Sequence, residues 1–460
     1  MIAILPILPA LWGLMWLLGL LLAPGLWWLF RQSHWRLALA FVKSQWRGFA
    51  VLTALAIAVP STYSAALSAF NRSDDLPPKT NLSFHSWPTA RGSLLRTGSD
   101  DCRGPRELAV LWAARTDYVF LSSPAICGKY VVAVGSKGDT ARCFCWNLIT
   151  GEELWSGGPT DYRMTLSSPV LHDGLIFCGE GVHHTPNSRL LCLDPRLVDR
   201  HSVAWFWQTA SHVECTPACD EKTVYVAAGD DGVYAFRTDP TLTAQERLLW
   251  HTTGDRLPDA ETALAVHNGR VYVGLGHGGT ALVALDANTG AELHRATFSM
   301  PVFAPPAILG DTLIIGLGPG NLVDAATAGP GELRCLDLEA LQTRGRLETS
   351  ASVLSAPAIH AHNAVCVVAD GQVLTIDRKA NLLRQWRSPT PILSSAAVSH
   401  DLVYCVDADG LLTALDADQM APVRRLRLGP SGLFVSSPVV ARGRVIVGTP
   451  AGLMCVGETP

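Results

Sequence analysis

Histidines and carboxylates gather in one part of the sequence, where they could bind a metal ion. The segment GEGVHHTPN carries Glu180, His183 and His184, and His212 and Glu214 follow further along the chain. Imidazole and carboxylate groups are ligands of divalent transition ions. Adjacent side chains on an extended segment point in opposite directions, and solvated loop histidines are common. These five residues are therefore metal-ligand candidates only if the fold brings their loops together.

A second candidate site lies in the segment GLGPGNLVDAATAGPGE, residues 316–332. It is the longest insert that follows an expected strand, and its polar side chains are Asn321 and Asp324. Long loops on a rigid scaffold commonly carry binding residues. We expect Asn321 and Asp324 to contact a ligand or partner.

Twelve cysteines raise the question of redox chemistry. Cys192, Cys335 and Cys455 occupy one repeated position. Because cysteine exchanges with alanine there, the three are predicted to be small buried packing groups rather than reactive thiols. Disulfide pairing among the other cysteines stays open. The alanines at this position are Ala235, Ala284 and Ala414.

Internal repeats are the elements that must position all of these residues. Each copy has an apolar segment near a proline, a turn, a β-branched run and a glycine-containing turn, which is typical of a β-hairpin. Most copies continue into a third and a fourth strand, and they recur every 39 to 51 residues, the spacing of four-stranded propeller blades. The opening segments of the eight copies are residues 122–138, 167–181, 215–232, 261–279, 304–320, 355–371, 394–410 and 436–452.

The pattern predicts an all-β fold, an eight-bladed β-propeller of four-stranded antiparallel sheets over residues 108–460. The last copy has only three strands, because it stops after LMCV, residues 453–456. An open ring would leave exposed sheet edges. We expect LAVLW, residues 108–112, to supply the missing strand and close the ring.

The N-terminal part predicts a membrane segment of two α-helices that precedes the propeller. Residues 2–30 carry no charge and are long enough to span a bilayer, and residues 48–70 form a second uncharged run that Pro60 weakens. The loop 31–47 holds four basic residues, which favours a cytoplasmic location for it. We therefore expect residues 1–70 to anchor the chain in the bacterial inner membrane, residues 71–107 to form a linker and lead-in, and the propeller to lie in the periplasm.

At this level of detail the sequence resembles the PQQ-like β-propeller repeat family. The resemblance rests on WPTARGSLLRTG, residues 87–98, on the repeat starts, and on LDANTGAEL, residues 285–293. Other stretches resemble membrane-associated members from planctomycete-type bacteria. The family includes quinoprotein alcohol dehydrogenases and a propeller lipoprotein of outer-membrane assembly. In the dehydrogenases, the resemblance implies PQQ and calcium in the central funnel under a disulfide of adjacent cysteines, and this sequence has no adjacent cysteines.

We expect a membrane-anchored extracytoplasmic propeller that binds a protein, peptide or surface polymer, within an envelope complex and without catalysis of its own. Two alternatives stay open: a PQQ-dependent quinoprotein-type oxidoreductase, and an accessory or sensor subunit of a membrane complex. The net charge of −4 provides no general attraction for nucleic acid, so we expect no nucleic-acid partner.

Overall fold

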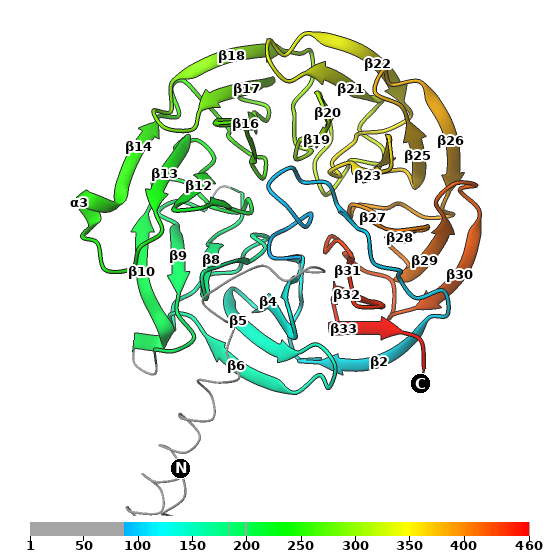
Figure 1. Ribbon diagram of the computed structural model, residues 1–460, viewed down its shortest axis with the longest axis horizontal. Helices are drawn as coiled ribbons and strands as arrows, with labels where there is room; N and C mark the ends of the chain where they lie inside the picture. Colours follow the sequence, from blue (N-terminus) through cyan, green and yellow to red (C-terminus); the bar gives the residue numbers. More distant parts are fainter. Residues whose placement is uncertain (1–86, 184, 198–199, 460) are drawn as a thin grey trace, which may run out of the picture. The chain divides into compact units, whose positions relative to one another are not determined.

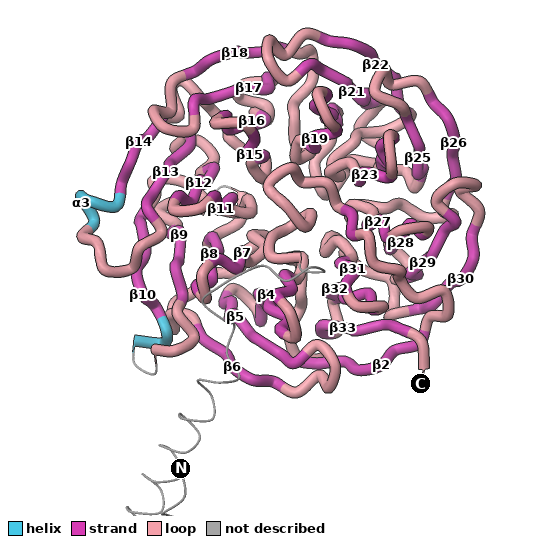
Figure 2. Tube along the Cα trace, in the orientation of Figure 1, coloured by secondary structure: helices cyan, strands magenta, loops and turns pink. Residues whose placement is uncertain are grey.

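Eight four-stranded antiparallel sheets follow one another around a closed ring (Figure 1). The computed structural model describes residues 87–183, 185–197 and 200–459. In each sheet the shortest strand lies nearest the axis and the fourth strand lies at the rim (Figure 2). The eight-bladed propeller predicted from the repeats is therefore confirmed.

The first four blades run from residue 125 to residue 297. Their strands are β3 (Ala125–Cys127), β4 (Tyr130–Lys137), β5 (Thr140–Asn147) and β6 (Glu153–Gly157); β7 (Val170–His172), β8 (Leu175–Gly179), β9 (Arg189–Leu193) and β10 (Val203–Gln208); β11 (Ala218–Asp220), β12 (Thr223–Ala227), β13 (Val233–Arg237) and β14 (Leu248–Thr252); and β15 (Ala265–His267), β16 (Arg270–Gly274), β17 (Ala281–Asp286) and β18 (Glu292–Thr297). Two short helical turns, η1 (Arg200–Ser202) and α3 (Ala244–Arg247), lie in connections between third and fourth strands.

The last four blades complete the ring. Their strands are β19 (Ala307–Leu309), β20 (Thr312–Leu317), β21 (Gly331–Asp337) and β22 (Thr343–Thr349); β23 (Ala358–His360), β24 (Asn363–Val367), β25 (Gln372–Ile376) and β26 (Leu382–Arg387); β27 (Ala397–Ser399), β28 (Leu402–Val406), β29 (Leu411–Asp416) and β30 (Pro422–Arg427); and β31 (Val439–Ala441), β32 (Arg444–Thr449) and β33 (Gly452–Gly457), with β2 (Ala109–Ala114) as the fourth strand.

The ring is closed by strand β2. It pairs antiparallel with β33, with Ala109 opposite Gly457 and Ala114 opposite Leu453. The predicted closure is confirmed, although the strand runs over 109–114 rather than 108–112. Both ends of the propeller thus share one sheet, so neither is left as an open edge.

The core lies between neighbouring blades. Phe177 and Leu190 of the second blade, for example, pack with Val224 and Phe236 of the third. The middle strands are buried on both faces, as in β8, whereas rim strands such as β26 are largely exposed. This explains why the second strands read as continuous apolar runs rather than as alternating ones.

The repeated small position on the third strands is buried, as the sequence predicted. Cys192, Cys335 and Cys455 are completely inaccessible to solvent. Cys192 lies opposite Trp205 on the rim strand, and Cys455 lies opposite Trp112, next to an irregularity in the pairing. A small side chain leaves room for the indole there. The three cysteines at this position are free thiols in this structure.

Residues 87–98 form a plug inside the ring (Figure 1, blue). Their backbone carbonyls accept hydrogen bonds from the N–H of the middle residue of six innermost strands, and β1 (Ser99–Asp100) then pairs parallel with β27. This segment falls in the stretch assigned from sequence to a linker and lead-in, and its central position was not foreseen. The six partners are Ile126, Leu171, Val266, Ile308, Ile359 and Val398.

The expected membrane anchor, residues 1–70, and the start of the lead-in, residues 71–86, lie outside the described residues. Within the part of the chain that is described, no helix has the length and apolar character that crossing a bilayer requires.

Candidate functional site

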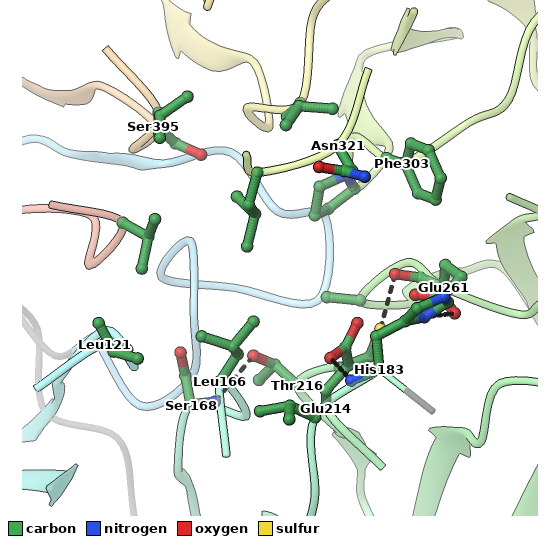
Figure 3. Close-up of a pocket in the computed structure, with 18 of the residues that line it drawn as sticks. Leu121, Leu166, Ser168, His183, Glu214, Thr216, Glu261, Phe303, Asn321 and Ser395 are labelled. Carbon is green, nitrogen blue, oxygen red and sulfur yellow. Dashed lines mark hydrogen bonds and ion pairs between the residues drawn. The ribbon is translucent and has the colours of Figure 1, made fainter. Parts of the chain in front are cut away.

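A pocket of about 530 Å³ opens in the central channel (Figure 3). It is lined chiefly by the segments that precede the innermost strands, whereas the plug bonds to those strands themselves. Pocket and plug therefore occupy successive depths of one channel. Every blade contributes to the pocket wall, which makes the wall as rigid as the ring.

One repeat position gives the pocket its character. The residue before each SSP-like start lines the pocket, and we call these eight residues the funnel ring. Six are apolar, whereas the third and fourth blades place glutamates there. Two neighbouring carboxylates thus replace core-type side chains on one side of the wall. The funnel ring consists of Leu121, Leu166, Glu214, Glu261, Phe303, Leu354, Leu393 and Val435.

The hydroxyl groups of the SSP-like starts fasten this wall. The backbone N–H of one blade donates to the hydroxyl two residues beyond the ring position of the next blade, at 2.9–3.2 Å. These bonds satisfy buried backbone donors that no strand pairs. The chain of bonds runs from Ala356 through Ser395, Ser437, Ser123 and Ser168 to Thr216.

Where the hydroxyl chain ends, a cluster of two histidines and two glutamates begins. Nδ1 of His183 and Nε2 of His212 both lie 3.0 Å from the same oxygen, Oε1 of Glu261. One ligand-type atom from each of His183, His212, Glu214 and Glu261 lies within 4.8 Å of all the others. In Figure 3 His183, Glu214 and Glu261 are gathered on one side of the pocket.

Further hydrogen bonds hold the members of the cluster in place. The backbone N–H of His183 donates to Oε2 of Glu214 at 2.6 Å. The second ring nitrogen of His212, Nδ1, lies 3.2 Å from the hydroxyl of Ser211. Asp259 stands beside Glu261 and accepts from the Gly278 N–H at 3.0 Å. His212 is thus oriented with Nε2 facing Glu261.

The cluster strongly perturbs the acidity of its members. The hydrogen bond to Glu261 raises the pKa of His183 to about 9, despite partial burial. Burial opposes protonation of His212, but its hydrogen bond to Glu261 and the nearby negative charges leave its pKa raised. Burial, and then the charge of Glu261, raise the pKa of Glu214 to about 7. Burial, and then the hydrogen bond with Glu261, raise the pKa of Asp259 to about 6. Burial also acts on Glu261, but hydrogen bonds from both histidines and Asp259 hold its pKa well below the usual value.

The predicted metal-ligand candidates are only partly brought together. His183, His212 and Glu214 converge in the cluster. Glu180 does not join them, because its fully buried carboxylate accepts hydrogen bonds from Arg189 on the neighbouring strand and from Arg163. His184 lies outside the described residues.

The two loop candidates also separate. Asn321 lines the pocket (Figure 3). The side chain of Asp324 accepts the backbone N–H of Asn321 at 2.8 Å and so holds the turn instead. Val323, between them at the pocket, is almost fully exposed.

Glu261 is the cluster residue that sequence reasoning missed. The repeats were aligned on their SSP-like starts, and the residue just before the start was not compared between copies. At that position glutamate stands against leucine, phenylalanine or valine in six copies. This contrast marks both Glu214 and Glu261 without any structure.

Fold and pocket together define an eight-bladed β-propeller with a pocket in its central channel. The family model described as outer membrane protein assembly factor BamB matches residues 240–328. No curated protein sequence matches the chain significantly.

Among solved structures, BamB from Moraxella catarrhalis shares the fold at a TM-score of 0.58, with 16% identity over 77% of this chain and 98% of that one. The quinohemoprotein alcohol dehydrogenase of Comamonas testosteroni has a TM-score of 0.65, with 11% identity over 83% and 82% of the two chains. A computationally designed protein, Ika8, has a TM-score of 0.60, with 16% identity over 76% and 98%. The family match covers one part of the chain, and the solved structures show that it shares the propeller fold.

The residues of the pocket do not fit PQQ with calcium. PQQ is a flat quinone with three carboxylates, so a site for it needs several cationic or donor groups and flat contacts. The described pocket lining has no arginine or lysine and offers Glu214 and Glu261 as carboxylates, with Phe303 as its only phenyl, phenol or indole ring. Calcium takes oxygen ligands, whereas this cluster offers two imidazoles. We therefore derive no reaction through that cofactor.

Proposed function

We propose that the chain is a membrane-anchored, extracytoplasmic propeller that binds a protein, peptide or surface polymer at its funnel, as a scaffold within an envelope complex. The uncharged N-terminal runs of the sequence support the anchor, and the basic loop between them supports the orientation. The match to the outer membrane assembly factor BamB supports a partner in the cell envelope.

One observation carries the binding role: the wall of the funnel is apolar at six of its eight ring positions and opens into a pocket of about 530 Å³. A rigid concave apolar wall with a few polar groups is the usual form of a binding site. The exposed Val323 at the pocket adds an apolar contact for a segment that enters it. An apolar side chain of a peptide, or an apolar group on a polymer, fits this wall.

In-cell photo-crosslinking tests the proposal. Benzoylphenylalanine replaces Val323 or Leu393 in the full-length chain, and replaces Arg384, exposed on rim strand β26, as the control. We expect one shared adduct from the two funnel positions and none from the control. Mass spectrometry of the adduct tells a soluble partner from a membrane-embedded one.

A variant that fills the funnel tests whether the adduct depends on the pocket. Leu166→Trp narrows the pocket from the second blade and should remove the adduct at both funnel positions, while circular dichroism reports an intact fold. Adducts only at the rim, or funnel adducts that survive Leu166→Trp, would show that partners use another surface.

A further inference from the structure

We propose that His183, His212, Glu214 and Glu261 bind one divalent transition-metal ion on the wall of the funnel. The donors are two imidazole nitrogens and two carboxylate oxygens, within 4.8 Å of one another. Two ligand atoms bound to one ion at 2.0–2.2 Å are at most about 4.4 Å apart, so small side-chain shifts would bring these four donors onto one ion. This mixed nitrogen and oxygen set suits Zn²⁺ and its first-row neighbours better than Ca²⁺ or Mg²⁺.

The contacts around the cluster are those of oriented metal ligands. A metal-bound histidine usually engages its other ring nitrogen with a fixed partner, which sets the tautomer. The Ser211 hydroxyl does this for Nδ1 of His212, leaving Nε2 directed at Glu261. The backbone of His183 fixes Glu214 in turn.

Charge balance is consistent with a bound dication. Glu261 and His212 keep only 4% of their side-chain surface exposed, and Glu214 stands at the neighbouring ring position, where six other blades place apolar groups. Buried carboxylates require compensation. One dication with two neutral imidazoles balances both glutamates, using groups that already face one another.

The position also provides access. The side chain of His183 is 46% exposed, and its cluster forms part of the pocket wall. An ion can therefore enter from the funnel, and a ligand held by the apolar ring would pass next to it. Metal binding does not depend on the proposed partner, so either proposal can fail alone.

Zinc titration of the full-length protein in detergent is the first test, with a competing chromophoric chelator as the readout. We expect one Zn²⁺ per chain. His212→Gln and Glu261→Gln should each weaken binding at least 100-fold. His277→Gln should change it less than about threefold, because His277 lines the same pocket but does not belong to the cluster.

Two further readouts distinguish a built site from incidental binding. Co²⁺ should give a visible ligand-field spectrum that His212→Gln abolishes. Zinc binding at pH 7 should release about one proton or more, measured by calorimetry in buffers of different ionisation enthalpy, because ligands must lose their protons. Glu214→Gln is a third cluster variant, in case the other two misfold. Its circular dichroism spectrum must match that of the parent protein while its zinc affinity falls.

The proposal is overturned if zinc fails to bind at one equivalent, or if binding is as tight in folded His212→Gln and Glu261→Gln as in the parent. It is also overturned if His277→Gln is the variant that abolishes binding.

Discussion

Replacing Arg96 of the plug tests whether this segment is structural. Arg96 is completely buried, and its guanidinium donates to the carbonyls of Leu264, Ala90 and Pro217 at 2.7–3.0 Å and to the Thr89 hydroxyl at 2.8 Å. The change Arg96→Met keeps the length of the side chain and removes every donor. It leaves buried acceptors from different blades without a partner.

The magnitude follows from the acceptors. Each buried acceptor that loses its partner costs about 1–3 kcal/mol, so the acceptors of the three shortest bonds together represent about 6 kcal/mol at the middle of that range. Burial lowers the pKa of Arg96 to about 10, so removing its charge returns part of that cost. We expect a net loss of about 2–3 kcal/mol in the free energy of unfolding.

Arg91→Met is the matched control. Arg91 is also buried in the plug, but it donates only to the carbonyls of Ala396 and Pro357, and its Nε has no hydrogen-bond partner among the described residues. We expect a loss of about 1 kcal/mol or less. Urea unfolding followed by tryptophan fluorescence measures both. Equal midpoints for Arg96→Met and the parent protein would refute the assignment of the plug as a stabilising element.

Three further outcomes are expected. The pKa of His183 is raised to about 9 in the folded protein, so the stability that its protonated form contributes is fully present below pH 6.5 and is lost as the pH rises through 9. Solvent screening limits this contribution to about 1 kcal/mol. Urea unfolding should show the parent protein to be less stable at pH 9.5 than at pH 6.5, and His183→Gln should lack this loss. Cys192→Ala should change stability by less than about 1 kcal/mol, whereas Cys192→Leu should cost about 1–3 kcal/mol by overpacking against Trp205, as read from thermal unfolding. Alkaline phosphatase fused after residue 459 should be active in cells, and an inactive fusion would contradict the extracytoplasmic orientation.

The ring could be predicted from sequence because each blade repeats the same local physics. An Asn-Gly or Asp-Gly pair with positive φ, as at Asn268 and Gly269, forces a tight hairpin, and the buried runs that follow have strand character. Copies of one hairpin pattern at blade spacing admit few other folds.

The site was only partly predictable, because its geometry depends on which strands become neighbours. Glu180 was grouped with the histidines by sequence proximity, yet Arg189 on the adjacent strand takes its carboxylate. Glu261 lies far from His183 in sequence and meets it only across the funnel wall. Nothing near Arg96 in the sequence indicates the carbonyls that surround it.

The plug is hydrogen-bonded to the segments that carry the cluster, so it contributes to the position of the two glutamates. Arg96 donates to the carbonyl of Leu264 at 2.8 Å, three residues after Glu261, and to that of Pro217 at 3.0 Å, three residues after Glu214. One side chain thus spans the two segments that carry the glutamates of the cluster. The ligand atoms of a metal site must be held within about 0.5 Å of the geometry that the ion requires. We therefore expect Arg96→Met to weaken zinc binding about tenfold or more. Arg91→Met should leave zinc binding nearly unchanged, because Arg91 bonds to the sixth and seventh blades, which carry no residue of the cluster. Unaltered zinc affinity in a folded Arg96→Met protein would show that the ring alone positions the two glutamates.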